Sequence, residues 1–209
     1  RALARDAGVP YLALEDGFLR SVMPGVSGEP PLSLVVDDLG IYYDATRPSR
    51  LEQWLAESDF DTAELDRART LIESLRRTGL SKYNHQPAID LGPKRRKRVL
   101  VVDQTAGDQS IRLGLPSTDF EGMLESACAD HPGAEIVVKA HPDVMLGRKR
   151  GALGTGNQPV RFLTEPAHPA SLLGQVDRVY VMTSQLGFEA LIHELPVTCF
   201  GVPLYAGWG

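Results

Sequence analysis

The sequence predicts an α/β protein whose second part is built on a parallel, doubly wound sheet. From residue 99 onward, short apolar runs alternate with amphipathic helical patterns, Gly and Pro mark most transitions, and polar residues gather directly after the apolar runs. The 209 residues are 43% hydrophobic and 23% charged, which supplies enough apolar material for a buried core. This composition excludes a disordered or fibrous chain.

Charge and hydropathy exclude two further classes of protein. The formal net charge of −5 argues against nucleic acid as the main partner. No apolar stretch approaches the ~20 residues of a membrane span. Cys128 and Cys199 lie far apart, which suits a reducing compartment and predicts neither a disulfide nor a zinc site. We therefore expect a soluble protein that holds no metal.

Neither end of the sequence has the pattern expected of a natural chain terminus. RALARDAG at 1–8 has the pattern of the last turns of a helix that ends at Gly8. PLYAGWG at 203–209 is an aromatic, glycine-rich loop with nothing after it to pack against. We therefore expect a piece of a longer protein.

The first part of the chain, residues 1–84, predicts a partial Rossmann-like domain. A short strand at 11–14 follows the opening helix, as in half of a βαβ unit, and residues 21–33 are loop. Short strands are expected at 34–36 and 40–43. A helix through 51–55 follows, with Ser49 or Thr46 as its N-cap, and a second helix at 62–78 ends at Gly79.

Residues 85–98 predict a linker because they show no periodicity and end in the basic run KRRKR. The run is interpreted as a solvated segment in front of a strand, and it is also the one candidate for peripheral membrane contact. Residues 99–209 then form the second domain. Its expected strands are 99–102, 135–139, 160–163, 178–181 and 197–200, and its expected helices are 118–129, 169–176 and 186–193.

Ligands of an open parallel sheet bind beyond the carboxyl ends of its strands, so the residues that follow each strand are the candidates for function. Three His-Pro pairs occur, but only His141 directly follows a strand, with Lys139 two residues before it. A cation, an imidazole and the rigid turn at Pro142 suit a phosphate or nucleotide. The alternative is an ordinary surface histidine.

Ser184, Gln185 and Glu189 open a helix directly after a strand. The free N–H groups and hydroxyls of such a helix start can hold an anion. The same residues also fit an ordinary capping box, and the two interpretations are compatible.

Three carboxylates follow strands on both sides of the linker. Glu15 and Asp16 belong to the first part, and Asp108 belongs to the second. If the two parts face each other, these carboxylates meet across a cleft, as glycosyl transfer through a nucleophile and an acid/base pair requires. The alternative is a turn at Asp16 and an exposed loop acid at Asp108.

Seven ordered segments resemble the capsule polysaccharide Kdo transferase family of the KpsC type, and they cover nearly the whole chain. The segments are LEDGFLRS (14–21), PPLSLVVDDLGIYYD (30–44), SKYN (81–84), VVDQTAGD (101–108), VKAHPD (138–143), TSQLGFEA (183–190) and PVTCFG with YAGWG (196–209). The resemblance implies a GT-B-like pair of Rossmann-type domains with parallel sheets, both partly truncated here.

The resemblance also assigns roles to the candidate residues. It implies that Asp108 is the nucleophile of a retaining transferase and that Glu15 or Asp16 serves as acid/base or positions the acceptor. Arg20 is a further candidate, for contact with the carboxylate of Kdo or of the acceptor. The implied donor-binding residues are Gln104, Lys139, His141, Pro142, Ser184, Gln185 and Glu189. No cofactor and no metal are implied.

The activity implied is the transfer of Kdo from CMP-Kdo to a Kdo-primed lipid acceptor in the β-linked linker of a bacterial capsule. The expected location is the cytoplasmic side of the inner membrane, with other capsule-assembly proteins as candidate partners. The isolated piece is expected to be a poor enzyme. The alternatives are a non-catalytic nucleotide- or partner-binding module of capsule assembly or export, and a GT-B enzyme that uses another nucleotide sugar.

Overall fold

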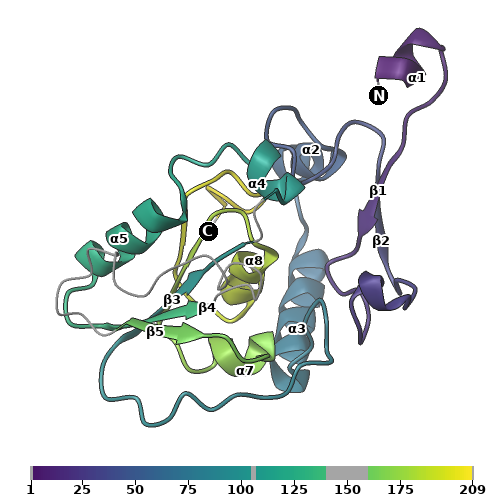
Figure 1. The fold of residues 1–209 in the computed structure, drawn as a ribbon. Coiled ribbons are helices and arrows are strands. Elements are labelled where there is room, and N and C mark those ends of the chain that lie inside the picture. Colours follow the sequence, from purple (N-terminus) through teal and green to yellow (C-terminus); the bar gives the residue numbers. More distant parts are fainter. Residues whose placement is uncertain (1, 105–106, 140–159, 209) are drawn as a thin grey trace.

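The computed structural model describes residues 2–104, 107–139 and 160–208, which form a compact α/β part and a more open amino-terminal part (Figure 1). The α/β part contains a five-stranded sheet in the order β5-β4-β3-β6-β7, and every pairing in it is parallel. Its strands are β3 (Arg98–Val102), β4 (Glu135–Lys139), β5 (Val160–Leu163), β6 (Arg178–Val181) and β7 (Val197–Cys199). The predicted α/β fold with a parallel sheet is confirmed.

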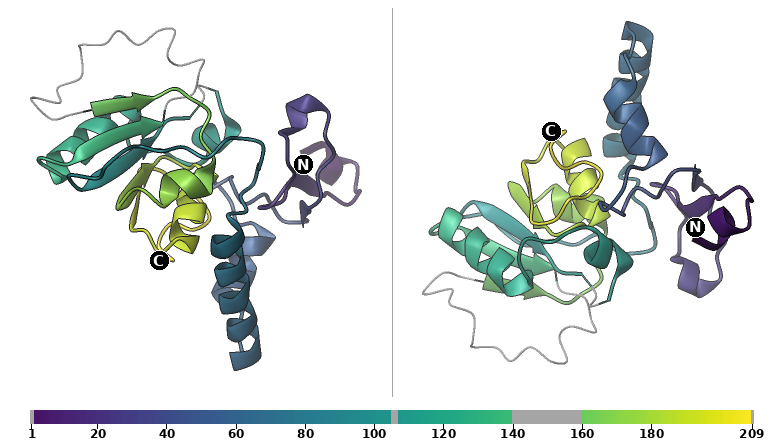
Figure 2. Two further views of the ribbon diagram at one scale, coloured as in Figure 1. Left: turned by 90° about the horizontal axis from the view of Figure 1, so that it is seen from below. Right: turned by 90° about the horizontal axis from the view of Figure 1, so that it is seen from above.

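Both faces of this sheet are covered, which explains why its strands read as continuous apolar runs. All five residues of β3 are buried. Val99 and Val101 pack on the side of α5 (Phe120–Asp130), whereas Leu100 and Val102 pack on the side of α7 (Pro169–Leu173) and α8 (Gln185–Ile192). Figure 2 shows these helices on opposite sides of the sheet.

The strand order contains a switch point between β3 and β6. From β3 the chain moves outward through β4 and β5, and it then returns to place β6 on the other side of β3. The loops after β3 and β6 diverge at this point, and such a crevice is where open α/β sheets bind ligands.

The amino-terminal part differs from the expected βαβ unit. After α1 (Ala2–Asp6), β1 (Ala13–Asp16) pairs with β2 (Leu34–Asp37) in an antiparallel two-stranded sheet, with the short helix η1 (Gly25–Ser27) between them. No parallel pairing of named strands occurs in the described residues of this part. The strand expected at 40–43 is also wrong, because these residues form a turn.

Two capped helices follow, as the sequence predicted. Ser49 and Glu52 form a capping box at the start of α2 (Arg50–Glu57), and Asp61 and Glu64 form a second one at the start of α3 (Thr62–Thr78). Gly79 ends α3 with the left-handed φ of +67° that favours glycine. Figure 2 shows α3 projecting from the rest of the molecule. Among the described helices, none is long and apolar enough to cross a bilayer.

The segment between α3 and β3 lies against the α/β part. Leu91 is buried in the core, and its N–H donates to Gln175 Oε1 over 2.7 Å. The basic residues 94–97 are exposed, as expected for a solvated run. Arg98 is buried at the start of β3, where its Nε lies 2.7 Å from a carboxylate oxygen of Glu135.

Candidate functional site

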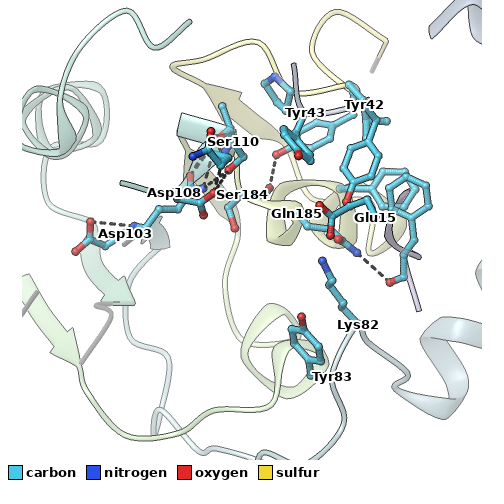
Figure 3. Close-up of a pocket in the computed structure, with 18 residues that line it drawn as sticks. Glu15, Tyr42, Tyr43, Lys82, Tyr83, Asp103, Asp108, Ser110, Ser184 and Gln185 are labelled. Carbon is cyan, nitrogen blue, oxygen red and sulfur yellow. Dashed lines mark hydrogen bonds between the residues drawn. The ribbon is translucent and has the colours of Figure 1, made fainter. Parts of the chain in front are cut away.

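A cavity of about 560 Å³ lies where the amino-terminal part meets the carboxyl ends of β3 and β6 (Figure 3). Both parts of the chain line it. The amino-terminal part contributes Glu15, Phe18, Tyr42, Tyr43, Lys82 and Tyr83. The α/β part contributes Asp103, Gln104, Asp108, Gln109, Ser110, Thr183, Ser184, Gln185, Phe188, Pro203, Leu204 and Tyr205.

Gln104 joins the two loops at the switch point. Its Oε1 accepts from the Thr183 N–H over 3.0 Å, and its Nε2 donates to the hydroxyls of Thr183 and Ser110, each over 3.2 Å. The side chain expected to bind the donor therefore also ties the exit of β3 to the exit of β6. This network fixes the floor of the cavity.

Asp108 begins α4 (Gln109–Leu113), a short helix that the sequence analysis did not predict. Its Oδ1 accepts from both the N–H and the hydroxyl of Ser110, each over 2.9 Å. Two donors to one oxygen hold the carboxylate against the helix start and keep it at the cavity wall. The sequence does contain a signal for this helix, because an aspartate directly before QSIRL is a typical N-cap residue.

Ser184 and Gln185 stand where α8 begins. The Ser184 hydroxyl accepts from the Leu186 N–H over 3.2 Å, so Ser184 is the N-cap, but the expected capping box with Glu189 does not form because the third residue of the helix is Gly187. Gln185 Nε2 crosses to the amino-terminal part and donates to the Phe18 carbonyl over 2.9 Å. Gly187 leaves the space that the Tyr205 ring occupies, since a Cβ there would overlap its hydroxyl.

Glu189, in α8, and Lys139, at the end of β4, lie outside the cavity lining. The Glu189 carboxylate accepts weakly from the Lys82 N–H at 3.5 Å. Burial raises the pKa of Glu189, and the charges of Lys82 and Lys139 partly offset this effect. Burial lowers the pKa of Lys139, and Glu189 opposes it. The hydrogen bond from Lys82 therefore places Glu189 at the junction of the two parts.

An aromatic series forms the wall opposite Asp108. Ring centroids lie 5.2 Å apart between Phe188 and Phe18, 5.3 Å between Phe18 and Tyr42, and 5.7 Å between Tyr42 and Tyr43. Burial raises the pKa of Tyr42 and of Tyr43, and the Glu15 carboxylate raises both further. Neutral hydroxyls therefore face the cavity beside a carboxylate, on a surface that suits a sugar ring (Figure 3).

Asp16 and Arg20 are paired with each other instead of lining the cavity. Arg20 Nε lies 2.7 Å from Asp16 Oδ2, and its Nη1 donates to the Ser21 hydroxyl over 2.8 Å and to the Glu29 carbonyl over 3.0 Å. Arg20 is 6% exposed. The guanidinium expected to bind a substrate carboxylate is therefore occupied within the fold.

The remaining predicted residues, His141 and Pro142, lie outside the described residues. Of the other two His-Pro pairs, His131 lies at the opposite edge of the sheet, where its Nε2 is 3.2 Å from the Tyr180 hydroxyl. His168 occupies the N-cap position of α7 without a side-chain capping bond. Neither histidine lines the cavity.

The sequence analysis missed the aromatic wall and Lys82. Tyr42 and Tyr43 were assigned to a strand, and no strand exit points to Lys82 and Tyr83, which follow α3. A Tyr-Tyr pair after a glycine, and a Lys-Tyr pair after a helix end, are weak signals by themselves. The fold brings them to the cavity from separate segments, since Tyr42 lies 27 residues after Glu15 and Lys82 lies 26 residues before Asp108.

The arrangement suits group transfer to or from a polyhydroxylated substrate. Glu15 and Asp108 present carboxylates from opposite walls, and the start of α8 adds hydroxyl and N–H groups beside them. Two carboxylates across a cavity provide the nucleophile and the acid/base group that glycosyl transfer requires.

Comparison with solved structures supports the same class of protein. The chain is 48% identical to the β-Kdo 2,4 transferase of KpsC from Thermosulfurimonas dismutans, with a TM-score of 0.84 over 99% of this chain and 66% of that one. It is 37% identical to the β-Kdo 2,7 transferase of the same KpsC, with a TM-score of 0.73 over 100% of this chain and 65% of that one.

Curated relatives come from capsule and lipopolysaccharide systems. The capsule polysaccharide modification protein LipA of Neisseria meningitidis serogroup A is 48% identical over 100% of this chain and 31% of its own length. The lipopolysaccharide-processing protein LpsZ of Rhizobium meliloti is 39% identical over 99% of this chain and 49% of its own length. The chain thus spans about a third to a half of these relatives.

The family model described as capsule polysaccharide biosynthesis protein matches residues 1–93 and 88–209. These two matches together extend along the entire sequence and include both walls of the cavity. The chain therefore belongs to the capsule polysaccharide biosynthesis protein family.

Proposed function

We propose that this chain forms the catalytic cavity of a retaining glycosyltransferase that moves Kdo from CMP-Kdo to a Kdo-primed lipid acceptor during capsule assembly. The observation that carries the proposal is the meeting of Glu15 and Asp108 in one cavity, although 92 residues of sequence separate their positions. The similarity to two Kdo transferases supports Kdo as the sugar that is transferred. The activity belongs to the longer protein of which the relatives are examples.

Asp108 is the nucleophile in this proposal. Its carboxylate attacks the anomeric carbon of the donor, the bond to the phosphate oxygen breaks, and CMP leaves. The acceptor hydroxyl then attacks the same carbon and displaces Asp108, while Glu15 on the opposite wall takes the hydroxyl proton. Two displacements leave the anomeric configuration unchanged.

The α/β part holds the donor nucleotide. The start of α8 at Ser184 and Gln185 faces the cavity, where free N–H groups and hydroxyls favour a phosphate. Lys139 ends β4 at the same edge of the sheet and adds a positive charge there. With these groups taking the phosphate charge, transfer proceeds without a divalent metal and withstands a chelator.

The higher identity to the 2,4 transferase, 48% against 37%, favours a β2,4 linkage in the product. A lipid-linked acceptor places the reaction at the cytoplasmic face of the inner membrane. The exposed basic run at 94–97 supplies a contact for that surface.

The test is transfer by the full-length parent protein with a synthetic Kdo acceptor. Asp108→Asn keeps an N-cap residue at the start of α4, because asparagine caps helices as well as aspartate does. We expect its rate to fall by about 10⁴-fold or more, as for other nucleophiles. Glu15→Gln should lower the rate by about 10²- to 10⁴-fold.

Asp119→Asn is the matched control, because Asp119 caps α5 with a bond of 2.9 Å to the Gly122 N–H and does not line the cavity. It should transfer at the normal rate. An Asp108→Asn protein with the rate of this control would refute the nucleophile, and a product of inverted configuration would refute the double displacement.

A further inference from the structure

Lys82 is the one cationic side chain among the described residues that line the cavity. The same lining carries the carboxylates of Glu15, Asp103 and Asp108. An acidic sugar that enters this cavity meets repulsion from all three, so it needs a local positive charge to bind. Lys82 lies on the wall contributed by the amino-terminal part, together with Glu15.

The main chain around Lys82 is held in place by hydrogen bonds. Its carbonyl accepts from the N–H groups of Arg20 and Ser21, over 3.1 and 3.3 Å. The Asn84 side chain accepts from the Ser81 N–H over 3.0 Å and donates to the carbonyls of Ser21 and Ser81, over 3.1 and 2.9 Å. The backbone is therefore fixed, and the lysine side chain is left as the adjustable element.

The ammonium group of Lys82 is not committed to an ion pair within the described residues. It lies 5.7 Å from the centroid of the Tyr83 ring, a distance at which the ring face attracts a cation. Arg20 differs in this respect, because Asp16, Ser21 and the Glu29 carbonyl occupy its guanidinium. Of the two cations, Lys82 is the one that remains able to bind a ligand.

We propose that Lys82 binds the carboxylate of an acidic sugar in the cavity, an assignment that rests on the proposed transferase function. Arg20 becomes a positioning residue, since its N–H holds the Lys82 carbonyl and its side chain holds the loop at Ser21–Glu29. The carboxylate belongs either to the acceptor sugar or to the sugar of the donor. In both cases the contact is one charge-assisted hydrogen bond from the ammonium.

Calorimetry on the full-length parent protein tests whether Lys82 binds a sugar carboxylate. The two probes are methyl β-Kdo glycoside and its carboxamide. The normal protein should bind the carboxylate about tenfold more tightly than the carboxamide, as a hydrogen bond between charged groups provides. Lys82→Met should bind both equally, and Lys82→Arg should keep part of the preference. Arg77→Met, which removes an exposed cation in the last turn of α3 outside the cavity lining, is the control and should keep all of it.

A second arm identifies the source of the carboxylate. If the acceptor sugar is bound, Lys82→Met loses the preference between the glycosides and keeps its KM for CMP-Kdo. If the donor sugar is bound, the KM for CMP-Kdo rises about tenfold while the dissociation constant of CMP itself stays constant. Unchanged CMP binding also establishes that the variant is folded.

The inference is overturned if Lys82→Met keeps both the normal preference between the glycosides and the normal KM for CMP-Kdo. Release of CMP from CMP-Kdo by the normal protein tests the proposed function separately. No release, with a Lys82-dependent preference intact, would refute the transferase and leave the carboxylate site standing.

Discussion

The two parts of the molecule bury different kinds of residue. In the α/β part, the sheet and its helices bury two apolar clusters that include Leu100, Val137 and Tyr180. In the amino-terminal part, the buried side chains are mostly polar, among them Arg20, Asp37 and Ser49. One part is therefore organised by apolar packing, and the other by hydrogen bonds.

The sheet of the amino-terminal part illustrates the difference. Leu14 and Val36 pair across β1 and β2, yet they are 64% and 54% exposed. A two-stranded sheet with an exposed apolar face has little stability of its own. Its position depends on contacts with the α/β part, such as the hydrogen bond from Gln185 to the Phe18 carbonyl and the packing of Phe18 on Phe188.

This difference shows how the site is built. The α/β part fixes Gln104, Asp108 and Ser184 through a core that holds independently of the other part. The amino-terminal part brings Glu15 and Lys82 to the same cavity on a more weakly supported frame. The side of the cavity in the α/β part is therefore expected to be rigid, and the side in the amino-terminal part to be adjustable.

The largest effect is expected in the apolar core. Leu100→Ala removes a fully buried side chain from the central strand and should lower the free energy of unfolding by about 3–5 kcal/mol, measured by urea denaturation. Leu34→Ala is the matched control, because Leu34 in β2 is 53% exposed and its loss should cost less than about 0.5 kcal/mol. Equal losses at the two leucines would refute the contrast between the two parts.

A smaller, local effect is expected in the polar network. Asp37 is 1% exposed and accepts from the N–H groups of Leu39, Gly40 and Arg50 over 2.7–2.8 Å. Asp37→Ala leaves these donors unpaired, at a cost of about 1–3 kcal/mol. Hydrogen exchange should therefore quicken at these three amides and stay constant in β3.

The neighbouring Asp38 provides the control for this experiment. It forms an exposed pair with Arg50 at 2.8 Å, so Asp38→Ala should cost at most about 1 kcal/mol. If Asp37→Ala quickened exchange equally in both parts, the amino-terminal part would not be a separate unit of stability.

The smallest expected effect is a change in stability with pH, and it arises from three histidines of the α/β part. Burial lowers the pKa of His131, His168 and His193 below the ordinary value of about 6.5. The unfolded chain therefore takes up protons first, so stability is lost as pH falls through about 6.5 toward the lower pKa values of the folded state.

The melting temperature should accordingly decrease on acidification from about pH 7.5 to about pH 5.5, by circular dichroism. His193→Gln should flatten this dependence, because Arg76 and burial together lower the pKa of His193. A melting temperature that rises over this range would contradict the assignment.

The sequence predicted the α/β part well because local pattern and tertiary environment agree there. The strands are buried on both faces, and their apolar runs therefore mark β3, β4 and β6 within one or two residues. The helices expected at 169–176 and 186–193 begin within one residue of α7 and α8.

The amino-terminal part was predicted less well because its short segments lack that agreement. The turn at 40–43 has a strand-like composition, but Asp37 accepts from the Gly40 N–H and turns the chain there. The pairing of β1 with β2 is antiparallel instead of parallel. Which strand pairs with which depends on contacts between distant segments, and a four-residue run does not contain that information.

The choice between Glu15 and Asp16 shows what remained for the tertiary structure. The sequence by itself determined that carboxylates occur on both sides of residues 85–98, but it placed Glu15 and Asp16 after a strand at 11–14, whereas both lie within β1. Neighbouring residues of a strand point to opposite faces, so only one of the two can face a given side. The packing of β1 decided which one, because Glu15 lines the cavity opposite Asp108 and Asp16 pairs with Arg20.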